Sequence, residues 1–194
     1  KDSKYYNSLY AIKKNDFNFF DKKILVPFGE FLPLRKFLNK FDFLTGNIDF
    51  DIGSEKRNIS LLKNLNFIPI ICYEIIFFND LINKDNAFAP IIINLTNDAW
   101  FGKFSGPYQH FYLTRLRSVE FNKYIIRSSN NGVSAVIDNY GEISEYINLN
   151  DNKTISLSLD LPSKLENKIF IHQFIYLFIF LILFFTIFFR LKDE

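Results

Sequence analysis

The sequence is poor in residues that would indicate a redox or nucleic-acid-binding role. It has one cysteine, no methionine, one tryptophan and two histidines among 194 residues. A single cysteine excludes an intrachain disulfide, so cysteine usage does not indicate the cellular compartment. Strong net charge is also absent, because 23 Lys and Arg side chains are offset by 21 Asp and Glu. Nucleic acid is therefore not expected as a partner.

A long uncharged stretch lies near the C-terminus. Residues 169–189 carry no formal charge, and from residue 174 onward they are apolar or aromatic except for Thr186. At roughly 1.5 Å per residue this helix would reach about 30 Å, the thickness of the hydrocarbon core of a bilayer. We predict one transmembrane helix at about 169–189, within a segment 164–194 that comprises linker, helix and short tail. A buried core helix is the alternative, but it would usually be shorter and show a polar face.

Residues 1–163 have the pattern of one domain that combines strands and helices. The whole chain is 48% hydrophobic, which supports a buried core. The mixed stretch 39–57 is typical of an excursion between strands. A helix is expected from Pro107, with apolar residues at helical spacing at Tyr108, Tyr112, Leu116 and Val119. Short apolar runs predict strands at residues 23–26, 67–72, 90–95, 124–128, 133–138 and 154–159.

Cys72 ends the apolar run 67–72 and is followed by Tyr73 and Glu74. A strand that stops at a cysteine and turns into a helix presents the sulfur beside backbone N–H groups that the helix has not used. Such groups stabilise a thiolate and an oxyanion, which nucleophilic acyl transfer requires. The alternative is that Cys72 is a small buried hydrophobe.

Lys22 precedes the run 23–26, and Glu30 follows Gly29 eight residues later. A glycine there would let the backbone turn and bring the carboxylate to an end of the sheet. Paired with Lys22, Glu30 would keep the ammonium group charged and oriented. The alternative is that Lys22 is a solvated charge at a strand edge.

A third polar cluster spans residues 94–102 (NLTNDAWFG). Asn97 and Asp98, taken singly, are more typical of turn formation than of catalysis. Trp100 and Phe101 would either line an acyl pocket or pack in the interior.

In this order, the segments resemble the nitrilase superfamily, also called carbon-nitrogen hydrolases, and within it the bacterial apolipoprotein N-acyltransferases. The resemblance runs from about Tyr6 to the terminal hydrophobic segment. The resembling motifs lie at residues 22–33 (KKILVPFGEFLP), 71–74 (ICYE), 94–102, 106–110 (GPYQH), 115–120 (RLRSVE), 127–134 (RSSNNGVS) and 138–141 (DNYG). The ordered set is specific, whereas ICYE alone would be weak.

The resemblance implies an α/β fold, the C-terminal part of a nitrilase-like αββα sandwich followed by one transmembrane helix. It also implies a Glu-Lys-Cys triad in which Lys22 stabilises the oxyanion and Cys72 is the nucleophile. Glu30, Tyr73 and Glu74 match supporting active-site positions. The family's general-base glutamate belongs to an earlier segment that is absent here. Since the chain also starts at Lys1 and has no methionine, we expect a fragment or processed product that is inactive alone.

Ile24, where the family often has His, and Thr114, where Ala is usual, are smaller departures from the pattern. The implied reaction transfers an acyl chain from a phospholipid through a Cys72 thioester to the N-terminal amine of a diacylglyceryl-cysteine apolipoprotein. No cofactor or metal is implied. The implied location is the bacterial inner membrane, with several spans in the full-length protein and the catalytic domain outside the cytoplasm. A membrane-tethered amidase or hydrolase and an inactive lipoprotein-binding module remain alternatives.

Overall fold

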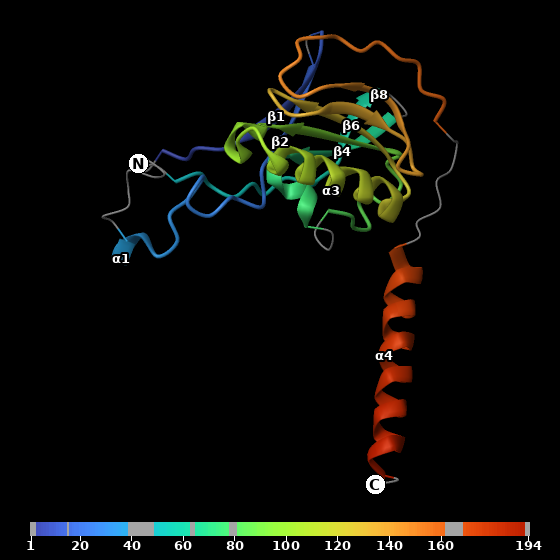
Figure 1. The fold of residues 1–194 in the computed structure, drawn as a ribbon. Coiled ribbons are helices and arrows are strands. Elements are labelled where there is room, and N and C mark those ends of the chain that lie inside the picture. The colour runs from blue at the N-terminus through green and yellow to red at the C-terminus, as the bar shows by residue number, and fades with distance from the viewer. Residues whose placement is uncertain are drawn as a thin grey trace.

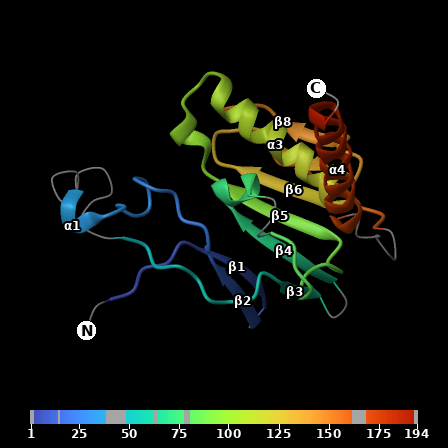
Figure 2. The same cartoon turned by 90° about the horizontal axis from the view of Figure 1, so that it is seen from below.

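The computed structural model describes residues 3–14, 16–38, 49–62, 65–77, 81–161 and 169–192. A six-stranded sheet forms the centre, a β-hairpin lies beside it, and helix α3 covers one face (Figures 1 and 2). This is the α/β class that the sequence predicts.

The main sheet has the strand order β3-β4-β5-β6-β7-β8. β4, β5 and β6 run parallel, whereas β3, β7 and β8 are antiparallel to their neighbours. The parallel strands are rich in isoleucine, as expected for strands covered on both faces. The strands are β3 (Ile59–Leu62), β4 (Leu65–Ile71), β5 (Ile91–Thr96), β6 (Tyr124–Ser129), β7 (Ser134–Ile137) and β8 (Ile143–Ile147).

The carboxyl ends of the three parallel strands meet at one edge of the sheet. Ile71 at the end of β4 pairs with Leu95, and Thr96 at the end of β5 pairs with Ser129. The polar segments that follow β4 and β5 therefore begin side by side. This edge carries the candidate site.

The hairpin consists of β1 (Ser8–Lys13) and β2 (Asp16–Asp21), paired in antiparallel register. It contacts β3 and β4 (Figure 2). Leu9 and Phe20 of the hairpin pack with Phe67 and Ile71 of β4 in one hydrophobic cluster. This packing brings Lys22, just after β2, toward the carboxyl edge of the main sheet.

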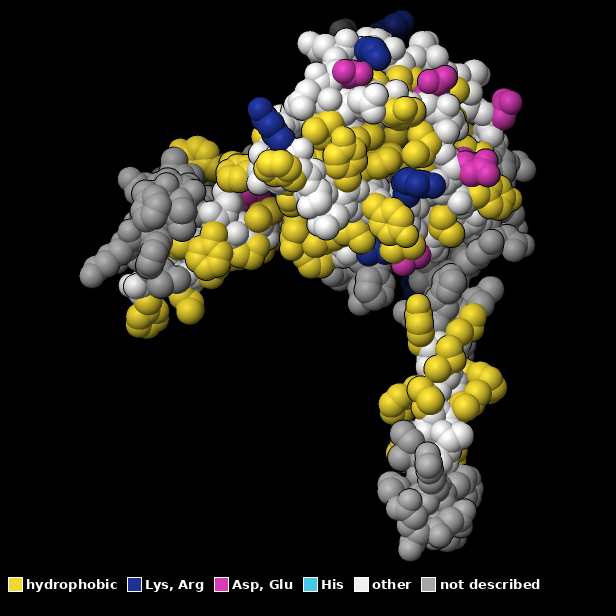
Figure 3. All heavy atoms as spheres, in the orientation of Figure 1, with side chains coloured by type: hydrophobic (Ala, Val, Ile, Leu, Met, Phe, Trp, Pro, Cys, Tyr) yellow, Lys and Arg dark blue, Asp and Glu magenta, His cyan; other side chains and the backbone are white. Residues whose placement is uncertain are grey.

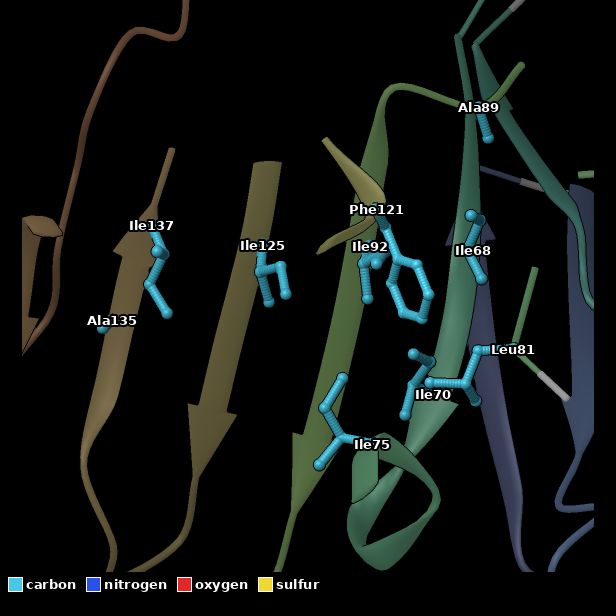
Figure 4. Packing of buried hydrophobic residues seen from close by; sticks show 10 residues of the cluster. All are labelled: Ile68, Ile70, Ile75, Leu81, Ala89, Ile92, Phe121, Ile125, Ala135 and Ile137. Carbon is cyan, nitrogen blue, oxygen red and sulfur yellow. The ribbon is translucent and has the colours of Figure 1, made fainter. Parts of the chain in front are cut away.

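A second cluster lies between the sheet and α3 (Ser105–Phe121). Side chains alternate along a strand, so Ile68 and Ile70 point into this cluster while Phe67 and Ile71 point to the hairpin. Ile92 and Ile125 continue the layer across β5 and β6 (Figure 4). Both faces of the central strands are thus covered.

The prediction of a helix near Pro107 is confirmed, but its apolar stripe does not face the core. The apolar stripe is exposed in the structure, as Figure 3 shows for the surface over α3, and consists of Tyr108, Tyr112, Leu116 and Val119. The buried positions are mostly polar and are Pro107, His110, Thr114, Arg117, Ser118 and Phe121. Polar side chains can be buried here because they find partners: Arg117 donates to the carbonyl oxygens of Ile75 and Ile76.

Four predicted strands are confirmed as β4 to β7, and two predictions are wrong. Residues 23–26 form no strand, because the N–H groups of Lys23 and Ile24 donate to the Glu74 carboxylate. Residues 154–159 pair with no strand in the part of the chain that the structure describes. Strands β1, β2, β3 and β8 were not predicted. Of the expected excursion 39–57, residues up to 48 lie outside the described ranges, and 49–57 contain no helix or strand.

Two further helices are short α1 (Arg35–Leu38) and C-terminal α4 (Ile169–Lys192). The helix expected at 169–189 is therefore present, and its described side chains are largely apolar and exposed. Within the described ranges, no helix has the length and apolarity needed to cross a membrane, so the predicted transmembrane span is not confirmed. The expected linker at 164–168 lies outside the described residues.

Candidate active site

Cys72 lies at a sharp turn on the carboxyl edge of the sheet. It follows β4 directly, has a left-handed backbone with φ of 53°, and begins the 3-10 helix η2 (Cys72–Ile76). Such a conformation costs about 1–3 kcal/mol in a residue other than glycine, so the surroundings must hold it. The half-buried thiol points to the carbonyl oxygen of Asn97, 3.8 Å from Sγ. The sulfur is therefore not sealed in the core.

Glu74 stabilises the turn through hydrogen bonds to the backbone on two sides of it. Its fully buried carboxylate accepts hydrogen bonds from the backbone N–H of Ile71 at 2.9 Å, Lys23 at 2.9 Å and Ile24 at 3.2 Å. It thereby joins the end of β4 to the segment that follows Lys22. Glu74 does not line the pocket described below.

Arg57 completes the environment of Glu74. Its guanidinium donates to both carboxylate oxygens of Glu74, at 2.7 and 3.0 Å, and to the carbonyl oxygen of Pro69 at 2.9 Å. The same group lies 4.7 Å from the centroid of the Phe20 ring. Both charged side chains are almost fully buried. Sequence reasoning missed Arg57, because nothing in a polar stretch distinguishes a buried arginine from a solvated one.

Lys22 and Glu30 form a second ion pair, with 2.7 Å between Nζ and Oε2. The Lys22 side chain is only 1% exposed, so it is not the solvated edge charge of the alternative interpretation. Glu30 also accepts hydrogen bonds from the N–H of Val26 and the amide of Asn7, both at 2.8 Å. The hydrogen bonds to Val26 and Asn7 therefore hold the Glu30 carboxylate in place, and this carboxylate orients the ammonium group of Lys22.

The turn before Glu30 differs in detail from the expectation. The left-handed residue is Phe28, with φ of 63°, rather than Gly29. The turn is closed by the N–H of Glu30, which donates to the carbonyl oxygen of Val26 at 2.8 Å. A Cβ at Gly29 would lie 3.3 Å from Cγ1 of Val26, so close packing is the constraint on this glycine.

A pocket of about 530 Å³ joins these groups, a volume in the usual range of small-molecule sites. Of the predicted site residues, it brings together Lys22, Glu30, Cys72, Tyr73, Trp100 and Phe101. Sequence reasoning missed several lining residues from the N-terminal part, for which no motif gave a signal: Asn7, Ser8, Leu9 and Phe50. Among the residues that the structure describes, no three His, Cys, Asp or Glu side chains are grouped as a metal site.

Asp98 and Asn97 behave differently, although both had been interpreted as turn formers. The Asn97 side chain accepts a hydrogen bond from the N–H of Ala99 and caps the 3-10 helix η3 (Asp98–Phe101), as expected. Asp98 is instead fully buried, with Oδ1 2.9 Å from Nδ1 of His110 and Oδ2 2.7 Å from Nη2 of Arg127. Because a carboxylate only accepts, Nδ1 of His110 carries the proton.

The charge on Asp98 is stabilised despite its burial. Burial alone would raise the pKa of this carboxyl, but the hydrogen bond from His110 and the positive charge of Arg127 outweigh it and hold the pKa below its usual value. Arg127 further donates to the carbonyl oxygen of Val133 at 3.1 Å and to Oγ1 of Thr114 at 3.1 Å. Asp98, His110 and Arg127 lie in motifs noted in the sequence, but periodicity gave no sign that they meet.

Comparison with protein families matches residues 2–163 to the family model described as carbon-nitrogen hydrolase. Curated relatives named apolipoprotein N-acyltransferase include those of Rickettsia typhi, 44% identical over 148 residues, and Allorhizobium ampelinum, 43% identical over 165 residues. The alignments cover 75% and 80% of this chain but only 30% and 31% of those relatives. The chain thus spans about a third of the length of the curated relatives that it matches.

Two solved structures share the fold. Saccharomyces cerevisiae Nit3, a member of branch 10 of the nitrilase superfamily, has a TM-score of 0.51 at 18% identity and is matched over 76% of this chain and 51% of its own. A carbon-nitrogen hydrolase from Helicobacter pylori G27 has the same TM-score at 13% identity, with coverages of 76% and 54%. At these identities the likeness shows the fold alone.

Proposed function

Because the chain belongs to the carbon-nitrogen hydrolase family, we propose that it forms the catalytic part of an apolipoprotein N-acyltransferase, with its catalytic domain at 1–163. The observation that carries the proposal is the position of Cys72. Its sulfur lies at a left-handed turn in the wall of a largely apolar pocket that also contains the buried Lys22–Glu30 pair. A nucleophile, a fixed cation and room for an acyl chain therefore adjoin one another.

In the first half-reaction, the Cys72 thiolate attacks an ester carbonyl of a phospholipid. A carbon–sulfur bond forms, the ester carbon–oxygen bond breaks, and the lysophospholipid leaves as an alcohol after taking up a proton. Lys22, held by Glu30, and the backbone N–H of Tyr73 stabilise the negative oxygen of the tetrahedral intermediate. Trp100 and Phe101 contribute to the wall beside the acyl chain.

The base that removes the Cys72 proton is neither Glu30 nor Glu74. Glu30 is engaged by Lys22, Val26 and Asn7, and Glu74 lies outside the pocket in its pair with Arg57. We assign this role to the first glutamate of a Glu-Lys-Cys triad, which the resemblance places in an upstream segment. The chain alone is accordingly expected to be inactive.

In the second half-reaction, the N-terminal amine of a diacylglyceryl-cysteine apolipoprotein attacks the thioester. The new amide bond forms, and the carbon–sulfur bond breaks to regenerate Cys72. A thioester is a good acyl donor to an amine, so two easier steps replace one difficult step. No cofactor takes part in this scheme.

Both substrates carry lipid chains, so we place the reaction at the bacterial cytoplasmic membrane, with the catalytic domain on its outer side. The exposed apolar side chains of α4 suit contact with lipid (Figure 3). The lipid chains of the proposed substrates support the membrane location, and the outer side is what the family resemblance implies.

The proposal is tested by incubating the full-length protein with a phospholipid whose acyl chain is isotopically labelled. Mass spectrometry of the peptide containing Cys72 should detect the acyl group, which should persist until an apolipoprotein is added. Cys72→Ser should show no acyl group on this peptide, because a hydroxyl ionises far less readily than a thiol. Loss of the acyl group to water at the same rate with and without apolipoprotein would instead identify a hydrolase.

A further inference from the structure

A buried arginine is connected to the turn that carries Cys72 through two side chains with which it forms hydrogen bonds, Asn94 and Asp98. Arg127, on β6, is 2% exposed and is among the largest fully enclosed side chains of the described residues. It does not line the pocket and so does not contact a molecule bound there. Its influence must pass through other groups.

The first connection runs through Asn94. Oδ1 of this buried amide accepts a hydrogen bond from Nη1 of Arg127 at 2.7 Å. Its Nδ2 faces the carbonyl oxygens of Ile70 and Cys72, at 3.3 and 3.5 Å. A guanidinium has no acceptor, so Arg127 fixes which end of the amide faces it. The donor end is thereby directed to the backbone of the nucleophile.

The second connection runs through Asp98. Its carboxylate accepts a hydrogen bond from Arg127. Asp98 is also the first residue of η3 and directly follows Asn97, whose carbonyl oxygen faces Sγ of Cys72. The site is tightly packed, since a Cβ at Gly132 would lie 1.9 Å from Oδ2 of Asp98. One guanidinium thus anchors the carbonyl group of Cys72 and the segment that contacts its sulfur.

The ion pair with Asp98 accounts for a charged side chain in the interior. Burial lowers the pKa of the guanidinium, while the charge of Asp98 and its hydrogen bond raise it. The planar guanidinium carries several donors, so it can serve Asn94 and Asp98 at the same time.

We propose that Arg127 is a positioning residue for the Cys72 nucleophile, fixing the left-handed turn through Asn94 and the facing loop through Asp98. The inference rests on the proposed function, because it assigns Cys72 the role of nucleophile.

The test compares Arg127→Lys, Arg127→Met and Asn94→Ala in the full-length protein. Arg115→Met is the matched control, since Arg115 donates to the carbonyl oxygen of Gly141 through Nε at 3.0 Å and Nη2 at 2.9 Å, without a contact to Asn94 or Asp98. Acylation of the peptide containing Cys72 is measured at a series of phospholipid concentrations. The two quantities compared are the maximal rate of acyl transfer and the phospholipid concentration that gives half of it, with thermal unfolding used to verify folding.

Arg127→Lys keeps the charge but loses the fork of donors, so the maximal rate of acylation should fall at least about 10-fold. The half-saturating phospholipid concentration should stay close to wild type, because Arg127 does not line the pocket. Asn94→Ala and Arg127→Met should reproduce this loss. The control should change neither quantity.

Wild-type acylation by folded Arg127→Lys and Asn94→Ala would overturn the positioning role. A raised half-saturating concentration with an unchanged maximal rate would indicate a role in substrate binding and would also overturn it. If Arg127→Met does not fold, the other two variants decide the positioning role. Failure of the wild type to acquire an acyl group would overturn the proposed function and this role with it, whereas an acylated wild type with equally acylated variants would overturn the role alone.

Discussion

Lys56 and Arg57 provide an internally controlled test of what the buried ion pair contributes to the fold. Lys56 pairs with Asp85 at 3.3 Å, with side chains 76% and 52% exposed, whereas Arg57 pairs with Glu74 at 2.7 Å, with side chains 2% and 0% exposed. Removing one member of an exposed pair costs less than about 1 kcal/mol. Removing one member of a buried pair leaves an uncompensated charge and costs about 3–5 kcal/mol.

We therefore expect Arg57→Met to destabilise the full-length protein strongly and Lys56→Met hardly at all. For a domain of this size, 1 kcal/mol corresponds to about 2–4 °C in the melting temperature. Thermal unfolding should thus show a fall of roughly 6–20 °C for Arg57→Met and at most about 4 °C for Lys56→Met. Equal melting temperatures for the two variants would refute the argument that Glu74 depends on Arg57.

Three further outcomes are expected. Lys22→Ala should lower the rate of Cys72 acylation by about 100- to 1,000-fold, with a smaller effect on phospholipid binding, since it removes charge stabilisation of the intermediate; an unchanged rate would exclude this role. Burial lowers the pKa of Lys123 from 10.5 to about 8, so the unfolded chain binds more protons between these pH values and stability should rise with pH there. Relative to Lys123→Met, the free energy of unfolding should increase by roughly 3 kcal/mol from pH 8 to 10.5, and a constant difference in denaturant titrations would contradict this. Gly132→Ala would place a methyl group 1.9 Å from Oδ2 of Asp98 and should destabilise the protein by about 1–3 kcal/mol, whereas an unchanged denaturation midpoint would show that Asp98 has room to move.

The central strands could be predicted because buried strands consist of runs of consecutive apolar residues, which are visible in the sequence. Runs such as residues 67–72 and 90–93 are apolar at successive positions, as strands covered on both faces require. Residues 23–26 show the limit of this rule. Three of these four residues are also apolar, but the N–H groups of Lys23 and Ile24 donate to a carboxylate distant in sequence instead of to a strand.

The candidate site was predicted best where a residue's chemistry and its place at the end of a strand agreed. Cys72 and the pair of Lys22 with Glu30 meet in one pocket, as expected. Arg57 and Arg127 could not be predicted, because burial of a guanidinium depends on acceptors that only the folded chain supplies. For the same reason, the spacing of apolar residues in α3 could not show that its mostly polar side is the buried one.

The left-handed backbone at Cys72 limits which nucleophilic residues can occupy this position. With φ at 53°, a side chain that branches at its β-carbon would collide with the adjacent peptide groups. Threonine, which some enzymes use as a nucleophile, is thus disfavoured at this position by its shape before its reactivity matters. Homologous proteins that retain this turn can accommodate serine at the position of Cys72. Threonine, whose hydroxyl group is a secondary alcohol, would first require a different main-chain conformation.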